Sequence, residues 1–218
     1  MGINKLSLTL ANHLAERLNY DEEEADVLRY GFEVLIGEVI KITVLVLLSL
    51  VLGIFPYVLL ITFFSVSYRS LSGGIHFNTY GRCFVFSLVL ILSLGKISQE
   101  FGNIAFPLFI FYLLAGAVFL ISFYITLKYA PVDSENKPLS KKKKKEMKKL
   151  SLIWLTISFI VMAINLMIVP IEVIEVIRSY IIAVLFGILV QALGLLPVVS
   201  RTVTAIDLYL DKTILKRG

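Results

Sequence analysis

The chain has 218 residues, of which 58% are hydrophobic and only 17% are charged, and its formal net charge is +5 at pH 7. Its mean hydropathy is +0.87. This composition excludes a water-soluble globule, a disordered chain, a collagen and a coiled coil. One cysteine and two histidines also exclude an intramolecular disulfide and the usual four-ligand zinc site. We therefore expect an integral membrane protein with no metal and no cofactor.

The N-terminal segment, residues 1–30, predicts an amphipathic helix on the membrane surface. It is not a signal peptide, because it lacks a continuous apolar core and carries five acidic residues between Asp21 and Asp26. Leucines recur every four residues and form one apolar stripe, with polar residues opposite: Leu6, Leu10, Leu14 and Leu18. His13 belongs to the polar face, where we expect it to be solvated.

Six stretches are candidates for transmembrane helices, each of which needs about 20 apolar residues. They cover residues 32–52, 54–70, 81–95, 104–127, 150–169 and 180–199, and the second and third are short. The first stretch also carries Glu33, Glu38 and Lys41, and the last two should pair because three residues separate them on one helix face. Asn165 and Gln191 are expected to bridge helices.

The C-terminal segment, residues 200–218, predicts a second amphipathic surface helix. Its apolar stripe lies opposite a polar face that includes Asp207, Asp211 and Lys212, and consists of Val203, Ile206, Leu210 and Ile214. The predicted fold class is therefore all-α. We expect a polytopic membrane protein with about six transmembrane helices, amphipathic surface helices at both termini, and a single membrane-embedded domain over residues 1–218.

The basic residues predict the orientation of the chain. With six spans, nearly all of the 21 lysines and arginines lie on the side of the termini, and only Lys96 and Arg178 lie on the other. The positive-inside rule then places both termini, the loop 69–82 and the basic loop 128–149 in the cytoplasm.

Within the basic loop, five lysines follow one another without a break: Lys141, Lys142, Lys143, Lys144 and Lys145. A run of this kind often binds nucleic acid. In so apolar a chain it fits a membrane-flanking segment better, so we expect a lipid bilayer and no nucleic acid as its partner.

The segment 69–83 is where chemistry is expected. It holds the only cysteine, Cys83, seven residues after His76, and a thiol with an imidazole is the minimum for thiol nucleophilic catalysis. On one straight helix the two would lie about 10.5 Å apart, too far for a pair. However, Gly73-Gly74 breaks the helix, and Asn78 or Thr79 can cap a new one. Cys83 would then lie in its first turn, where free N–H groups favour an oxyanion.

The same residues also have plainer interpretations. A lone cysteine in an apolar helix is usually inert, and a lone loop histidine usually has no role. Arg69 alone would be a membrane-flanking cation on the cytoplasmic side. The His–Cys spacing by itself therefore leaves catalysis open.

A wider set of motifs resembles one family. Arg69-x-x-x-Gly73-Gly74-x-His76, followed seven residues later by Cys83, looks like the signature of the accessory gene regulator B (AgrB) family. The stretches Tyr129-Ala130-Pro131…Asn136-Lys137-Pro138 and Tyr30-Gly31-Phe32-Glu33 are similar to further family motifs. The resemblance covers most of the chain.

The resemblance implies a membrane cysteine endopeptidase of Gram-positive quorum sensing. Its substrate would be an AgrD-like precursor pheromone peptide with an amphipathic N-terminus and an acidic C-terminal tail. By analogy Cys83 is the nucleophile and His76 the general base, while Arg69, Gly73 and Gly74 support them. Attack by Cys83 would release the tail, and an internal cysteine or serine of the precursor would then displace the thioester to close a thiolactone or lactone ring.

Other residues and functions remain open at this stage. Glu33 would face the catalytic loop or lie at the membrane interface, and Lys141–Lys145 would dock the acidic tail, set the membrane orientation, or do both. The main alternative is a small transporter or exporter of a peptide or ion, although its two halves show no internal repeat. A non-catalytic scaffold is the third interpretation. The family resemblance also leaves a homodimer open.

Overall fold

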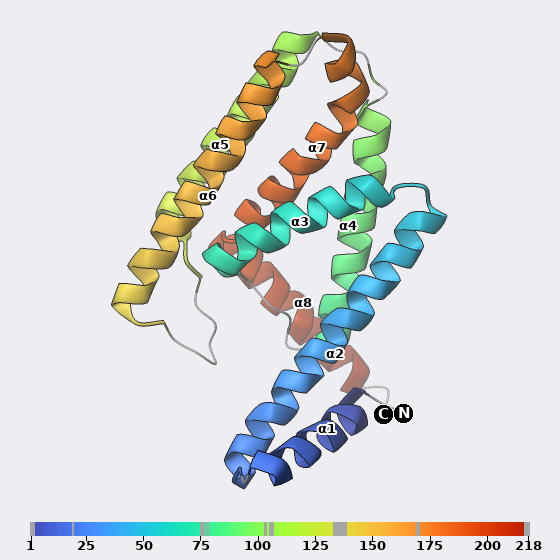
Figure 1. Cartoon of the computed structure of the whole chain (residues 1–218), viewed down its shortest axis with the longest axis vertical. Coiled ribbons are helices and arrows are strands. Elements are labelled where there is room, and N and C mark those ends of the chain that lie inside the picture. Colours follow the sequence, from blue (N-terminus) through green and yellow to red (C-terminus); the bar gives the residue numbers. More distant parts are fainter. Residues whose placement is uncertain are drawn as a thin grey trace. The chain divides into compact units, whose positions relative to one another are not determined.

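The structure, a computed structural model, describes residues 3–18, 20–74, 77, 79–102, 104, 107–132, 139–168 and 171–215. Within these residues the chain forms helices and no strand (Figure 1). In chain order the helices are α1 (Ile3–Leu18), α2 (Glu22–Val51), α3 (Phe55–Ser72), α4 (Tyr80–Gly102), α5 (Leu108–Tyr129), α6 (Lys141–Ile168), α7 (Ile171–Leu193) and α8 (Pro197–Leu215). The predicted all-α fold class is confirmed.

Residues Met1–Gly53 form one compact unit, which holds α1 and α2. Asp21 caps α2: its carboxylate accepts a hydrogen bond from the Glu24 N–H at 2.8 Å, and the Glu24 side chain accepts from the Asp21 N–H at 3.2 Å. This capping box satisfies free N–H groups of the first turn. It explains why α2 begins at Glu22, ten residues before the predicted span. Glu38 pairs with Lys41 as expected.

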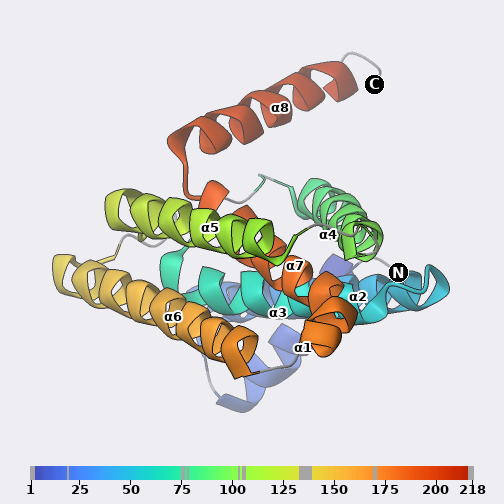
Figure 2. The same cartoon turned by 90° about the horizontal axis from the view of Figure 1, so that it is seen from above.

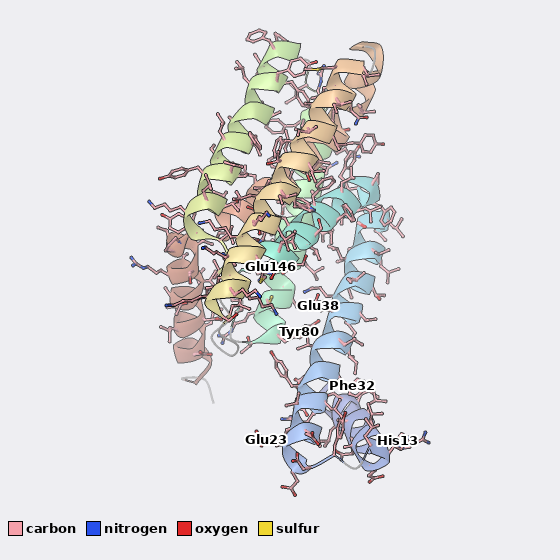
Figure 3. All side chains as sticks on the ribbon, turned by 60° about the vertical axis from the view of Figure 1, so that its left-hand side comes forward. His13, Glu23, Phe32, Glu38, Tyr80 and Glu146 are labelled. Atoms are coloured by element: carbon pink, nitrogen blue, oxygen red, sulfur yellow. The ribbon has the colours of Figure 1, made fainter. Side chains whose placement is uncertain are left out.

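In α1 the buried face is the one with small side chains. Ser7, Ala11 and Ala15 are buried, whereas three leucines of the predicted stripe, Leu6, Leu10 and Leu18, are 40 to 48% exposed. Small side chains let two helices approach closely, so α1 packs on α2 through them and turns its leucines outward. His13 is exposed, as expected (Figure 3).

The second compact unit, Ile54–Gly218, has its core between α3, α5, α6 and α7. The buried side chains at its centre include Tyr68, Leu155, Phe159, Leu185 and Ile188. Helices α5 and α6 lie side by side in both views (Figures 1 and 2). Helix α3 crosses α7 closely at Gly187, where a side-chain Cβ would lie only 2.7 Å from the Ile61 carbonyl oxygen.

The number of membrane spans differs from the prediction. Among the described residues, α2, α4, α6 and residues Phe109–Tyr129 of α5 are long and apolar enough to cross a bilayer, and α7 with α8 gives a fifth candidate bent by 78°. The predicted count of six is therefore not confirmed. Helix α4 continues past the predicted end at residue 95, and its last turns carry an ion pair between Lys96 and Glu100 at 2.7 Å.

The basic segment 128–149 was expected to be a loop, and for its second half this is wrong. Helix α6 begins within it at Lys141, so the whole lysine run is helical: Lys141, Lys142, Lys143, Lys144 and Lys145. Ser140 caps this helix, since its Oγ accepts from the Lys143 N–H at 3.3 Å. The cap and the good helix propensity of lysine together explain the early start.

The last predicted span, residues 180–199, is also wrong in its bounds. The helix is broken after Leu193, where α7 ends, and α8 starts at Pro197. Proline suits this place because its fixed φ and its missing N–H fit a first helical position.

Candidate functional site

The loop expected to carry chemistry starts from a sharply fixed turn. Helix α3 ends at Ser72, and Gly73 adopts φ +69° and ψ −165°, a region that is essentially restricted to glycine. Gly73 forms an isolated parallel bridge with Val132, whose N–H donates to the Ser72 carbonyl at 3.0 Å. The turn therefore brings together two motifs that are separate in the sequence: Gly73-Gly74 and the stretch after Tyr129.

A buried glutamine from α7 holds the same turn. The Gln191 side chain is 4% exposed. Its Nε2 donates to the Ser72 Oγ at 3.0 Å and to the Gly73 carbonyl oxygen at 2.8 Å. The prediction that Gln191 bridges helices is confirmed. Asn165 does not follow the prediction, because it is exposed and donates to the Val161 carbonyl of its own helix.

Arg69 and Gly74, two predicted supporting residues, are in contact. A Cβ placed on Gly74 would lie 2.7 Å from Nη1 and 2.9 Å from Cζ of Arg69. The guanidinium therefore lies flat against the Gly74 backbone, in space that any other residue would occupy. This gives a physical reason for an arginine in the last turn of α3 and a glycine five residues later.

Cys83 lies at the start of α4. Its N–H donates to the Thr79 carbonyl oxygen at 3.2 Å, which makes Thr79 the N-cap residue that precedes the helix. The N–H groups of residues 81 and 82 precede this first intrahelical bond, in the position predicted for an oxyanion site. Cys83 is a free cysteine of intermediate exposure. Figure 3 labels Tyr80, the first residue of α4.

The contacts of the described residues do not link two further predicted site residues, His76 and Glu33, to Cys83. His76 lies outside the described residues, although its neighbour Phe77 packs on Phe86, one turn beyond Cys83, with ring centroids 5.2 Å apart. Glu33 is half-buried in α2, in the other compact unit.

The predicted docking lysines form the first turns of α6, beside Glu146, which Figure 3 labels. Four of them are exposed, namely Lys141, Lys142, Lys143 and Lys145, and Lys144 is half-buried. No described contact joins this run to Cys83. The lysines are therefore a separate surface, and whether they bind a substrate tail stays a prediction.

A cluster of charges that the sequence did not predict includes Arg82, the residue before Cys83. Arg82 donates through Nη1 to Asp207 Oδ1 at 2.9 Å and through Nη2 to Asp211 Oδ1 at 2.6 Å. Asp207 and Asp211 were predicted to lie on the outer, polar face of the tail helix, and for Asp207 this is wrong: it is 1% exposed, whereas Ile206 is 42% exposed. The only sequence signal was the pair of acids one helical turn apart.

A cavity of about 320 Å³ lies beside the Gly73 turn, against Val132. Its walls come from the end of α5 and the junction of α7 and α8: Tyr129, Val132, Leu195, Pro197, Ser200 and Arg201. The lining is largely apolar, with one cation at its edge.

Comparison with known proteins decides the family. The chain matches the accessory gene regulator B family over residues 7–195, which include the Gly73 turn, Cys83 and the whole of α6. The chain belongs to the accessory gene regulator B family. The resemblance of the sequence motifs to this family is thereby confirmed.

Individual relatives of the AgrB family match along most of their length. A putative AgrB-like protein 2 of Clostridium perfringens is 28% identical over 97% of this chain and 100% of the relative. The accessory gene regulator protein B of Staphylococcus intermedius is 30% identical over 91% of this chain and 94% of its own. That of Staphylococcus aureus strain MRSA252 is 27% identical over 86% and 91%. No solved structure gives a significant match.

Proposed function

We propose that this protein is a multi-pass cell-membrane cysteine endopeptidase of quorum sensing. It removes the acidic tail of an AgrD-like precursor peptide and closes the remaining peptide into a thiolactone or lactone ring. Cys83 is the nucleophile and His76 the general base. The observation that carries the proposal is Cys83 at the start of α4, in a chain that belongs to the AgrB family.

The geometry of the described residues supports this chemistry. A thiolate at the start of a helix is favoured by the helix dipole. A tetrahedral oxyanion formed on the substrate would find donors in the N–H groups of residues 81 and 82. The Gly73 turn, fixed by Gln191 and Val132, gives the loop between α3 and α4 a rigid starting point. A rigid support matters because small misplacements of reacting groups slow catalysis strongly.

Two acyl transfers on one sulfur complete the reaction. Cys83 attacks the scissile carbonyl, the C–N bond breaks, and the proton passes through His76 to the leaving amine of the tail. The internal thiol or hydroxyl of the precursor then attacks the carbonyl of the Cys83 thioester, the C–S bond to Cys83 breaks, and the proton of the attacking group passes through His76 to the freed Cys83 sulfur. Exchange of one thioester for another is nearly isoenergetic, so ring closure to a thiolactone needs no ATP if water is excluded.

The direct test of this function is reconstitution with its peptide. The full chain in lipid vesicles is incubated with a precursor encoded beside it, and the products are identified by mass spectrometry. A free tail and a peptide that is lighter by one water than the linear product support the proposal. Transport of the intact precursor without cleavage would support the exporter interpretation instead.

The lysines at the start of α6 supply a docking site for the acidic tail. Lys141, Lys142, Lys143 and Lys145 are exposed to solvent. None of the first-turn residues is acidic, so the positive end of the helix dipole adds to their charge. Anionic lipid would be attracted by the same charges, so docking and orientation are compatible roles.

Replacing Lys141–Lys145 by glutamine is expected to weaken capture of the precursor more than the chemical step. Long-range attraction acts on the encounter, so KM should rise about tenfold while kcat changes little, and raised salt should have a similar effect. Steady-state kinetics with equal amounts of inserted protein measure both. A precursor with a neutralised tail is the control: equal damage with this substrate would contradict tail docking.

Labelling is expected to place both termini and the loop between α3 and α4 in the cytoplasm. The reason for this expectation is the asymmetry of basic residues in the six-span prediction, which assigns only Lys96 and Arg178 to the outer side. Single cysteines are introduced at Ser134 and near Lys96 in a Cys83→Ser background. An impermeant maleimide added to intact cells should label the second position and spare the first. Labelling at Ser134 from outside would contradict the orientation.

A further inference from the structure

The C-terminal helix α8 reaches the start of α4 through a group of three charged residues, which we call the Arg82 clamp: Arg82, Asp207 and Asp211. The two acids are one helical turn apart on α8, and one guanidinium contacts both. Arg82 Nη1 donates in addition to the Asp207 backbone carbonyl at 3.1 Å. The family match ends at residue 195, before α8 begins at Pro197, so the clamp joins the matched region to a helix beyond it.

The clamp fixes geometry as well as distance. The planar guanidinium presents its donors in a rigid fork, so contacts to two carboxylates and one carbonyl restrict how the guanidinium lies on α8. Arg82 and Cys83 are adjacent, with Cα atoms about 3.8 Å apart. The clamp thus ties α8 to the residue directly before the thiol.

The ion pair between Arg82 and Asp207 is the stronger half of the clamp, because it is buried. The Asp207 side chain is 1% exposed and that of Arg82 14%, whereas that of Asp211 is 45% exposed. A buried carboxylate is stable only with a countercharge and hydrogen bonds, so α8 cannot leave this position without exposing or stranding Asp207. Asp211 is screened by water and contributes less.

We propose that α8 is part of the candidate catalytic site, and that Asp207 and Asp211 are positioning residues that fix Cys83 through Arg82. This inference rests on the proposed function for its catalytic meaning. Its structural part, that the clamp controls the environment of the Cys83 thiol, does not depend on that function. The helix is therefore linked to the start of α4 through the residue that precedes the thiol.

The test uses the full chain in lipid vesicles and two measurements. Cys83 is the only cysteine, so alkylation by iodoacetamide reports on this thiol alone and needs no substrate. Tail release from the synthetic precursor gives kcat and KM. The variants are Asp207→Asn, Asp211→Asn, Asp211→Glu and, as the matched control on the exposed face of α8, Thr204→Asn.

We expect Asp207→Asn to lower kcat about tenfold or more with KM nearly unchanged, because the nucleophile is misplaced while substrate contacts remain. Its Cys83 should also be alkylated about threefold faster, as the start of α4 is no longer tied to α8. Asp211→Asn should lose about two- to threefold in kcat, in keeping with its exposure, and Asp211→Glu should restore it. Thr204→Asn should behave as the parent.

Each other outcome has a definite meaning. Parent kcat and parent alkylation in Asp207→Asn, at equal inserted amounts, would overturn the proposal and leave the proposed function standing. Faster alkylation in a protein whose parent form releases no tail would support the clamp and contradict the endopeptidase. If Asp207→Asn fails to insert, the half-exposed Asp211 carries the test, and parent values in Asp211→Asn would then overturn the proposal.

Discussion

Replacing Cys83 by alanine is expected to abolish tail release and ring formation together, by about four orders of magnitude or more. Both steps pass through one thioester on this sulfur, so neither can proceed without it. The protein should still insert and bind its precursor, because Cys83 is only part of the first turn of α4. Mass spectrometry of vesicle reactions measures both products. His76→Ala should likewise stop cleavage.

A modified substrate separates the two steps. A precursor whose ring-forming cysteine is alanine should still acylate Cys83 and then stall as a covalent adduct. A gel shift that hydroxylamine reverses would reveal the thioester. Tail release by Cys83→Ala at the parent rate would show that another group is the nucleophile, and the enzyme assignment would fail.

Replacing Gly73 by alanine is expected to have the second largest effect. A Cβ at this position would lie 2.2 Å from the Val132 carbonyl oxygen, and the backbone has φ +69°. The strained conformation and the clash together should cost about 2–4 kcal/mol. The Val132 bridge and the Gln191 hydrogen bond to Gly73 should both be lost. The thermal unfolding temperature in detergent should fall, and tail release should fall with it.

Gly116→Ala is the matched control for this change. Gly116 lies within α5, and a Cβ there would meet no atom within 4 Å. Alanine is the better helix former by about 1 kcal/mol, so this variant should unfold at the same or a higher temperature. A Gly73→Ala protein that unfolds like the Gly116→Ala protein would show that the turn tolerates a side chain, and that the bridge to Val132 does not hold the loop.

The sequence predicts the elements of this protein better than their partners. Apolar length and the glycine pair were enough to predict an all-α protein and a new helix carrying Cys83 in its first turns. Hydropathy could not predict that α6 begins at Lys141, because lysine is polar yet a good helix former, and Ser140 supplies the cap. Hydropathy also predicted the end of α4 too early, because Lys96 and Glu100 lower the mean hydropathy although they form an ion pair on the helix.

In the candidate site, contacts between segments that are distant in sequence could not be predicted from the pattern of either segment. An amphipathic helix was expected to turn its acids to water, and this rule failed for Asp207 because a countercharge, Arg82, is supplied from a segment 125 residues away in sequence. The bridge between Gly73 and Val132 is likewise invisible in either segment alone. Gln191 was correctly singled out, since a lone amide among apolar residues needs a hydrogen-bonding partner.

Helix α6 has a consequence for the geometry of substrate capture. It is continuous over 28 residues, about 42 Å, whereas the hydrocarbon core of a bilayer is about 30 Å thick. The apolar part of the helix after Lys149 nearly matches that thickness. The turns that carry the lysines therefore extend beyond the hydrocarbon core as a continuous, rigid helix. Under the proposed function, an acidic tail bound there would be held at a set level above the lipid, and the number of residues between the tail and the scissile bond would then affect cleavage.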